Sequence, residues 1–207
     1  ANTLQQQLLP RSLPEIPGLE VAARYLPGGP GVDVGAAGYD VIPMDDGRVG
    51  LAIGDVMGRG VAAAGVMAEL RNALRACALQ GLDPVKSMRL LDRLMDADGR
   101  GALATVLYAE LDPSRSTMLV ANAGHAPPLF IAADGSMRWL EVAPSPPVGA
   151  CVPGATRSDE TSAEVALPPG TTVIFYTDGL IERRGESLDD GMARLLSVVE
   201  ASPSTEP

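Results

Sequence analysis

Residues 48–79, RVGLAIGDVMGRGVAAAGVMAELRNALRACAL, contain an apolar run, a glycine-rich loop and a long helical pattern in direct succession. Residues 48–55 have the apolar composition of a strand, which ends at Asp55. In residues 61–79 apolar side chains recur every three or four positions, which predicts a helix with one buried face. The glycines between the two segments let the backbone approach a ligand closely before the helix begins.

The segments on either side extend this unit into an α+β pattern. Residues 39–44 are predicted to form a hairpin with residues 48–55, because Asp45-Asp46-Gly47 is a turn sequence. Asp83-Pro84 is expected to open a second helix, since proline is favoured in the first turn. Further strands are predicted at residues 19–26, 103–111, 118–122, 128–132, 137–141, 162–167 and 172–177, and a last helix at 190–201. Strands, two helices and then more strands indicate an α+β domain.

Composition and charge exclude several classes of protein. The chain has 207 residues, of which 46% are hydrophobic and 3% aromatic, so aliphatic side chains must form the core. A net charge of -10 argues against nucleic acid or an anionic membrane as a partner. Cys77 and Cys151 lack the spacing of a zinc site or a disulfide framework, which favours a reducing cytoplasm.

The ends of the sequence suggest a domain within a larger protein. Residues 1–14 are interpreted as the end of a linker helix from an upstream regulatory region, residues 15–201 as one domain and residues 202–207 as a tail. We expect no membrane contact by this domain, because no apolar run is long enough to span a bilayer.

Two acids lie where apolar segments end. Asp55 lies at the end of an apolar strand, within the sequence IGDVMGRG at residues 53–60, and Asp178 follows the apolar residues 173–177 and precedes Gly179. A single Asp-Gly pair is more simply explained as a turn. Two acids at two strand ends could instead share a hard cation such as Mg²⁺ or Mn²⁺, which prefers oxygen ligands.

Three motifs resemble one protein family in order and spacing. They are GDVMGRG at residues 54–60, NAGHAPPL at 122–129 and YTDGLIE at 176–182. Together they are similar to the sporulation and stress-response (SpoIIE-type) branch of the protein phosphatase 2C-like (PPM) family. The resemblance runs from about residue 4 to residue 196 and implies a four-layer α-β-β-α sandwich of two antiparallel sheets flanked by helices.

The resemblance also implies an activity. It implies a metal-dependent protein serine/threonine phosphatase, with two Mn²⁺ or Mg²⁺ ions and a metal-bridging hydroxide that attacks phosphorus. By analogy Asp55 would bridge both ions, the carbonyl of Val56 would bind one, and Asp178 would bind the other. The implied partners are a phosphorylated anti-sigma factor antagonist and an upstream sensor in the same polypeptide.

The chain lacks two acids that the family pattern leads one to expect. Ala37 stands where the family carries an aspartate that contributes to a metal site, and no final Asp-Asp-x-Thr segment is present. Asp33 and Asp40 are nearby candidates to compensate. These departures predict weak metal binding, with one ion or none, and leave open an alternative: a pseudophosphatase that binds a partner in the same pathway.

Three further residues have competing interpretations. Arg59 is a candidate substrate contact, although an exposed arginine at a helix start is a nearly equal alternative. His125, the only histidine, could act as a general acid, but its turn-like Gly-His-x-Pro-Pro context favours an architectural role. Cys77 lies on the apolar face of a predicted helix and is interpreted as a buried hydrophobe rather than a nucleophile.

Overall fold

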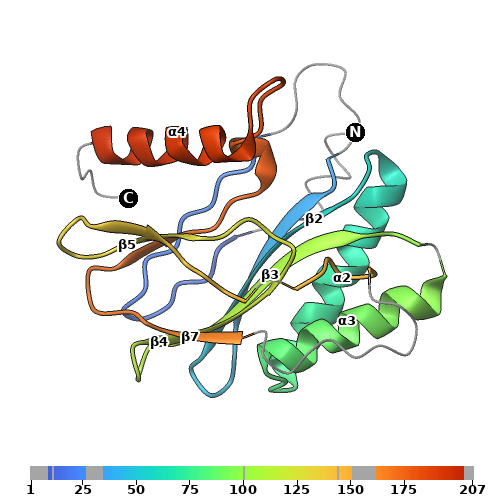
Figure 1. Cartoon of the computed structure of the whole chain (residues 1–207). Helices are drawn as coiled ribbons and strands as arrows, with labels where there is room; N and C mark the ends of the chain where they lie inside the picture. The colour runs from blue at the N-terminus through green and yellow to red at the C-terminus, as the bar shows by residue number, and fades with distance from the viewer. Residues whose placement is uncertain are drawn as a thin grey trace.

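Two antiparallel sheets pack face to face between helices, in the order α2 and α3, large sheet, small sheet, α4 (Figure 1). The computed structural model describes residues 9–10, 12–26, 35–99, 101–143, 145–150 and 162–202. The four-layer α-β-β-α sandwich predicted from the sequence is confirmed. None of the helices in these ranges is long and apolar enough to cross a membrane.

The large sheet has five strands in the order β1-β2-β3-β4-β7. The predicted hairpin is present, and Gly47 adopts a φ of 83° in its turn. Residues alternate between two buried faces, so that one face packs against the helices and the other against the small sheet. The strands are β1 (Ala37–Pro43), β2 (Val49–Val56), β3 (Ala104–Asp112), β4 (Thr117–Ala123) and β7 (Ser162–Ala166).

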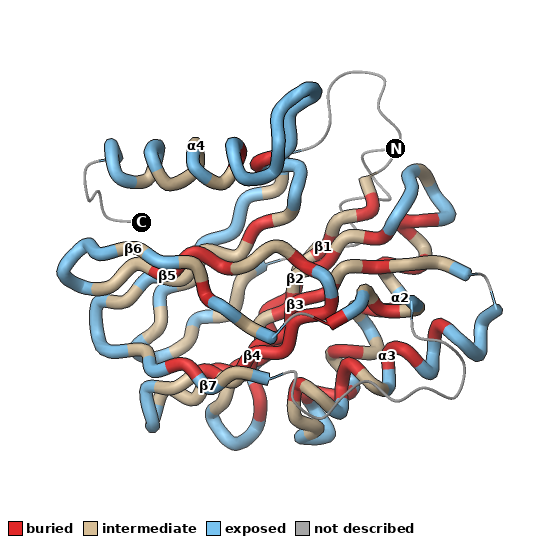
Figure 2. The backbone as a smooth tube through the Cα atoms, viewed as in Figure 1, coloured by how far each residue is buried: buried red, intermediate tan, exposed pale blue. Residues whose placement is uncertain are grey.

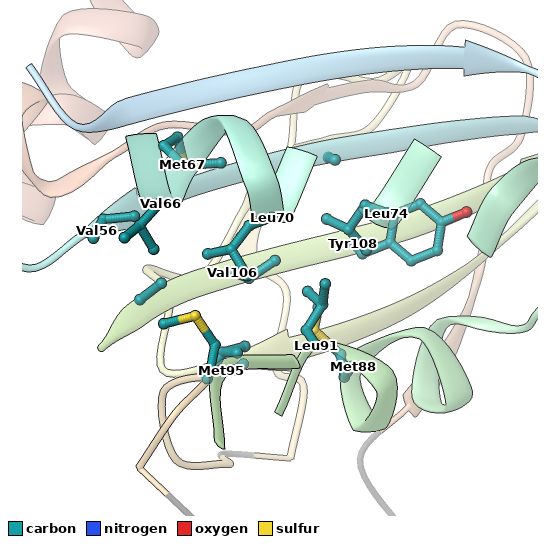
Figure 3. Packing of buried hydrophobic residues seen from close by; sticks show 14 of the residues in the cluster. Val56, Val66, Met67, Leu70, Leu74, Met88, Leu91, Met95, Val106 and Tyr108 are labelled. Atoms are coloured by element: carbon teal, nitrogen blue, oxygen red, sulfur yellow. The ribbon is translucent and has the colours of Figure 1, made fainter. Parts of the chain in front are cut away.

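Helices α2 (Val61–Leu79) and α3 (Pro84–Asp98) cover the outer face of the large sheet. The bounds of α2 are those predicted from its apolar periodicity. Asp83 caps α3 by accepting a hydrogen bond from the Lys86 amide at 2.9 Å. Figure 3 shows the core beneath these helices, which includes Leu70 and Leu91.

The small sheet has three short strands in the order β6-β5-β8: β5 (Leu129–Ile131), β6 (Met137–Trp139) and β8 (Thr172–Ile174). Its residues Phe130 and Val173 pack against Leu107 and Val120 of the large sheet. The strand predicted at 172–177 is shorter than expected. Its ladder ends at the Leu129–Ile174 pair, because Pro127, the next residue whose backbone would face β8, has no amide hydrogen to donate to Tyr176.

The last helix, α4 (Leu188–Ala201), is attached mainly at its start. A capping box between Ser187 and Asp190 begins the helix two residues before the predicted position. A Cβ atom on Gly191 would lie 2.2 Å from the Ile181 carbonyl oxygen, so only glycine permits this approach. The rest of α4 is largely exposed (Figure 2).

The strand predicted at residues 19–26 is wrong. Apart from the isolated bridge between Ile16 and Leu19, this segment forms no ladder. The side chains of Leu13, Ile16, Leu19 and Val21 nevertheless pack against the core between the sheets. The apolar pattern of this segment therefore reflects burial of its side chains. A strand also needs a backbone partner, and none completes one here.

Candidate metal centre

Asp55 lies at the end of β2 on the face directed toward the small sheet. Its neighbours at alternate positions, Leu51 and Ile53, pack in the core between the sheets. In the strand register Asp55 pairs with Ala37 on one side and with Thr105 on the other. Because directly paired residues share a face, these three side chains form one row across β1, β2 and β3.

The second acid approaches this row from the small sheet. Asp178 is exposed and begins a short 3₁₀ helix, η1 (Asp178–Leu180), after residues 175–177, which lie outside any strand and of which Thr177 is extended. Burial, and then the negative charge of Asp178, raise the pKa of Asp55 to about 6. The structure therefore brings together the two acids that the sequence singled out.

His125 connects the two sides of this site. Its Nδ1 atom lies 3.0 Å from the Thr105 hydroxyl, and its Nε2 atom lies 3.0 Å from the Tyr176 carbonyl oxygen. Its side chain is buried, and desolvation lowers its pKa to about 4. With both ring nitrogens engaged in this way, the architectural interpretation of His125 agrees with the structure.

The loop after Asp55 is exposed. Gly58 and Gly60 adopt φ values of 111° and 85°, which a residue with a side chain rarely adopts, and Arg59 lies between them. The side chain of Val56 is buried in the core under α2, so only its backbone can serve the site. The roles of Arg59 as a substrate contact and of the Val56 carbonyl as a ligand stay predictions.

Of the two candidates to compensate for Ala37, Asp33 lies outside the described residues. For Asp40 the structure corrects the expectation that its carboxylate replaces the missing acid at residue 37. Its carboxylate is buried on the helix-facing side of β1, where its oxygens lie 2.8 Å from Arg75 Nη2 and 3.2 Å from Arg71 Nε. Strand alternation places it on the opposite face from Asp55, so it joins β1 to α2 instead of binding a metal.

We predict that Asp40→Asn lowers the free energy of unfolding by about 2 kcal/mol, because it breaks a partly buried ion pair and leaves two arginines without their counter-charge. Arg75 is 40% exposed, which keeps the loss below that of a fully buried pair. Urea denaturation measures the change. Binding of Mn²⁺ should stay as in the wild type, and a weakened Mn²⁺ affinity with unchanged stability would contradict this assignment.

Few side chains near Asp55 could bind a metal ion. No group of three or more histidine, cysteine, aspartate or glutamate side chains that could hold a metal occurs within the described ranges. The methyl group of Ala37 occupies the position beside Asp55 where the resemblance expects an acid. The charges of the two carboxylates act on each other, and two such donors suit one hard cation that keeps several waters, as Mg²⁺ commonly does.

A hollow of about 650 Å³ lies between residues 122–127 (which include His125), the residues of β6 and those that follow it, and α4. His125, Trp139 and Met192 help to line it, but neither Asp55 nor Asp178 does. The acid pair therefore lies beside an exposed loop rather than in this hollow, and a large substrate can approach it.

We predict that Asp55→Asn stabilises the metal-free protein at pH 8. The pKa of Asp55 is raised from 3.8 to about 6, so the folded state holds its proton more tightly than the unfolded state. The free energy of unfolding of the wild type therefore falls as pH rises from about 4 to 6. Removing the charge should recover about 1 to 2 kcal/mol after allowance for solvent screening.

Denaturation in chelator at pH 8 and at pH 5 tests this prediction. The advantage of the variant should shrink toward acid pH, where the wild-type carboxyl is also neutral. A variant that is less stable than the wild type at pH 8 would contradict the raised pKa of Asp55.

Comparisons with known proteins agree with this fold. Residues 45–207 match the family model described as stage II sporulation protein E (SpoIIE). Phosphoserine phosphatase RsbP of Bacillus subtilis is 31% identical over 150 residues, which cover 70% of this chain and 36% of RsbP. Phosphoserine phosphatase RsbU of the same species is 24% identical over 189 residues, which cover 90% of this chain and 54% of RsbU.

The chain thus spans about a third to a half of the length of the curated relatives it matches. Among solved structures, the RsbU and RsbW domains of Rv1364c from Mycobacterium tuberculosis align with a TM-score of 0.73 and 32% identity. That match covers 84% of this chain and 47% of the other. The PP2C phosphatase domain of SpoIIE from Bacillus subtilis aligns with a TM-score of 0.68 and 16% identity over 82% of this chain and 48% of the other, which shows a shared fold.

Proposed function

The chain belongs to the SpoIIE family, the sporulation and stress-response branch of the PPM phosphatases, and from this premise we propose that it is a metal-dependent protein serine/threonine phosphatase. The observation that carries the proposal is the approach of Asp55 and Asp178 from opposite sheets. The open setting of this pair suits a phosphorylated side chain presented by a protein.

Three groups of this chain would hold the cation: the carboxylates of Asp55 and Asp178 and the carbonyl of Val56. A bound Mg²⁺ or Mn²⁺ supplies Lewis acidity and a water that is acidic enough to lose a proton near neutral pH. PPM enzymes in general use two such ions, and the small donor set of this chain favours fewer or weaker ones. Asp55, with a pKa of about 6, is ionised at neutral pH and available as a ligand.

Other side chains have separate tasks. Arg59, on the exposed loop after Asp55, would bind phosphate oxygens through its guanidinium group. Cys77 does not serve as a covalent nucleophile, because it lies on the buried face of α2 and burial raises the pKa of its thiol. These features support direct attack by water on the phosphoryl group, without a cysteinyl-phosphate intermediate.

The proposed substrate is a phosphorylated anti-sigma factor antagonist. Support comes from RsbP and RsbU, which are phosphoserine phosphatases, and from the similarity to a protein with RsbU and RsbW domains. We also propose that the chain works under the control of an upstream sensor, through the segment at residues 1–14. The similarity to the longer RsbP and RsbU supports this arrangement.

Ala37 favours a second candidate, a pseudophosphatase that binds a partner in the same regulatory pathway. This residue leaves the position directly across from Asp55 without a donor. Such a protein would recognise the phosphorylated partner and release it unchanged.

Hydrolysis separates the two candidates. The chain is incubated with a phosphoserine protein and with a small aryl phosphate, in Mn²⁺ or in chelator. Turnover that requires Mn²⁺ supports the phosphatase, and absence of turnover of both substrates at saturating Mn²⁺ supports the pseudophosphatase.

A further inference from the structure

The two acids of the site belong to different sheets, so something must fix their separation. Asp55 ends β2 of the large sheet, whereas Asp178 follows β8 of the small sheet. His125 lies between β4 and β5, where the chain itself passes from one sheet to the other. Its ring contacts Thr105, which pairs with Asp55 in the strand register, and the carbonyl of Tyr176, two residues before Asp178.

Elementary hydrogen-bond chemistry determines the state of the ring. A carbonyl oxygen only accepts hydrogen bonds, so Nε2 must carry a proton and donate it to Tyr176. In the neutral imidazole Nδ1 is then a bare acceptor, and the hydroxyl of Thr105 donates to it. The low pKa of the buried His125 agrees with a neutral ring. The result is a directed chain from Thr105 through His125 to Tyr176.

The imidazole has little freedom to move. The His125 amide donates to Asn122 Oδ1 at 2.7 Å, and the Asn122 side-chain amide donates to the His125 carbonyl at 3.0 Å. Gly124 has a φ of 68° and packs so closely that a Cβ atom there would lie 2.8 Å from Pro147. His125 as a whole is only 8% exposed. A rigid ring of this kind transmits the position of one sheet to the other.

We propose that Thr105 and His125 are positioning residues that set the spacing of the two acids and thereby the cation affinity of the site. This inference rests on the proposed function, because it takes Asp55 and Asp178 as the cation ligands. Neither residue touches the cation or the substrate. Thr105 holds the ring in register with the strand beside Asp55, and the ring holds the segment that carries Asp178.

The test compares two variants of Thr105. Thr105→Val keeps the branched shape but removes the donor to Nδ1, whereas Thr105→Ser keeps the hydroxyl. Free Mn²⁺ is counted by its electron paramagnetic resonance signal during titration of each full chain. We expect Thr105→Val to weaken Mn²⁺ binding roughly 10-fold, the lower end of the range for a partner bonded directly to a ligand, because Thr105 acts through His125 and the Tyr176 carbonyl; Thr105→Ser should restore most of it.

Kinetics and stability separate positioning from general damage. At saturating Mn²⁺ the KM for the phosphorylated substrate should stay unchanged in Thr105→Val, while the Mn²⁺ concentration for half-maximal rate rises. Thermal unfolding in chelator checks that both variants fold, and His125→Gln supplies a second break of the same chain of bonds. Equal weakening of Mn²⁺ binding in the Val and Ser variants would overturn the hydrogen-bond assignment.

The outcomes distinguish this inference from the proposed function. Equal Mn²⁺ affinity in wild type, Thr105→Val and His125→Gln would overturn the positioning role and leave the phosphatase standing. If Thr105→Val weakens Mn²⁺ binding but the wild type hydrolyses no phosphoserine, the proposed phosphatase activity alone is overturned. A wild type that binds no Mn²⁺ would overturn both.

Discussion

Asp55→Asn is expected to reduce Mn²⁺-dependent phosphatase activity at least about 100-fold, since loss of a metal ligand should exceed the effect of losing a group behind one. Asp55 ends β2 on the face directed toward the small sheet, and its ionised form is destabilised without a cation by burial and by the charge of Asp178. The neutral amide cannot balance the cation charge. Initial rates on a phosphoserine protein over a range of Mn²⁺ concentrations measure the loss.

The stability of Asp55→Asn excludes unfolding as the cause of a loss of activity. Asp55→Asn is predicted to be more stable than the wild type in chelator, so a loss of activity would report on the site. Asp40→Asn is a matched control: it makes the same chemical change on the other face of the large sheet, where Asp40 contacts Arg71 and Arg75. It should lose stability and keep its activity per folded molecule. If Asp55→Asn retains wild-type turnover, Asp55 is not a ligand and the proposed mechanism fails.

Ala37→Asp should strengthen Mn²⁺ binding, whereas Asp55→Asn weakens it. Ala37 and Asp55 are directly paired in the β1–β2 register, and Cβ atoms of such pairs lie about 4.5 to 5.5 Å apart. A carboxylate at residue 37 would therefore enter the row that Asp55 occupies. We expect Mn²⁺ affinity to rise roughly 10- to 100-fold and the rate at low Mn²⁺ to rise with it.

Ala37→Asn controls for the size of the new side chain. Without metal, Ala37→Asp should be less stable than Ala37→Asn at pH 8, because a third negative charge would join Asp55 and Asp178. An unchanged Mn²⁺ affinity in Ala37→Asp would mean that another acid already completes the site. Asp33→Asn then tests whether Asp33, which lies outside the described residues, is that acid.

Much of the architecture follows from local sequence. The apolar periodicity of residues 61–79 gave the bounds of α2, because a helix that buries one face must repeat its apolar side chains every three or four positions. The turn at Gly47 and the order of strands and helices follow in the same way from turn chemistry and apolar runs. The two acids were found because each closes an apolar segment next to glycine.

Only the tertiary structure decided how these parts meet. Burial in residues 13–21 could be predicted, but a strand also needs a backbone partner, and none completes a ladder there. Asp40 was a candidate to compensate because it is near Ala37 in the sequence, but the strand register places it on the opposite face of β1, against Arg71 and Arg75 of α2. The importance of Thr105 had no local signal, since it arises from its register with Asp55 and from a bond to His125. Sequence patterns report which side chains leave water, whereas strand register and the packing of the two sheets depend on contacts between residues far apart in the chain.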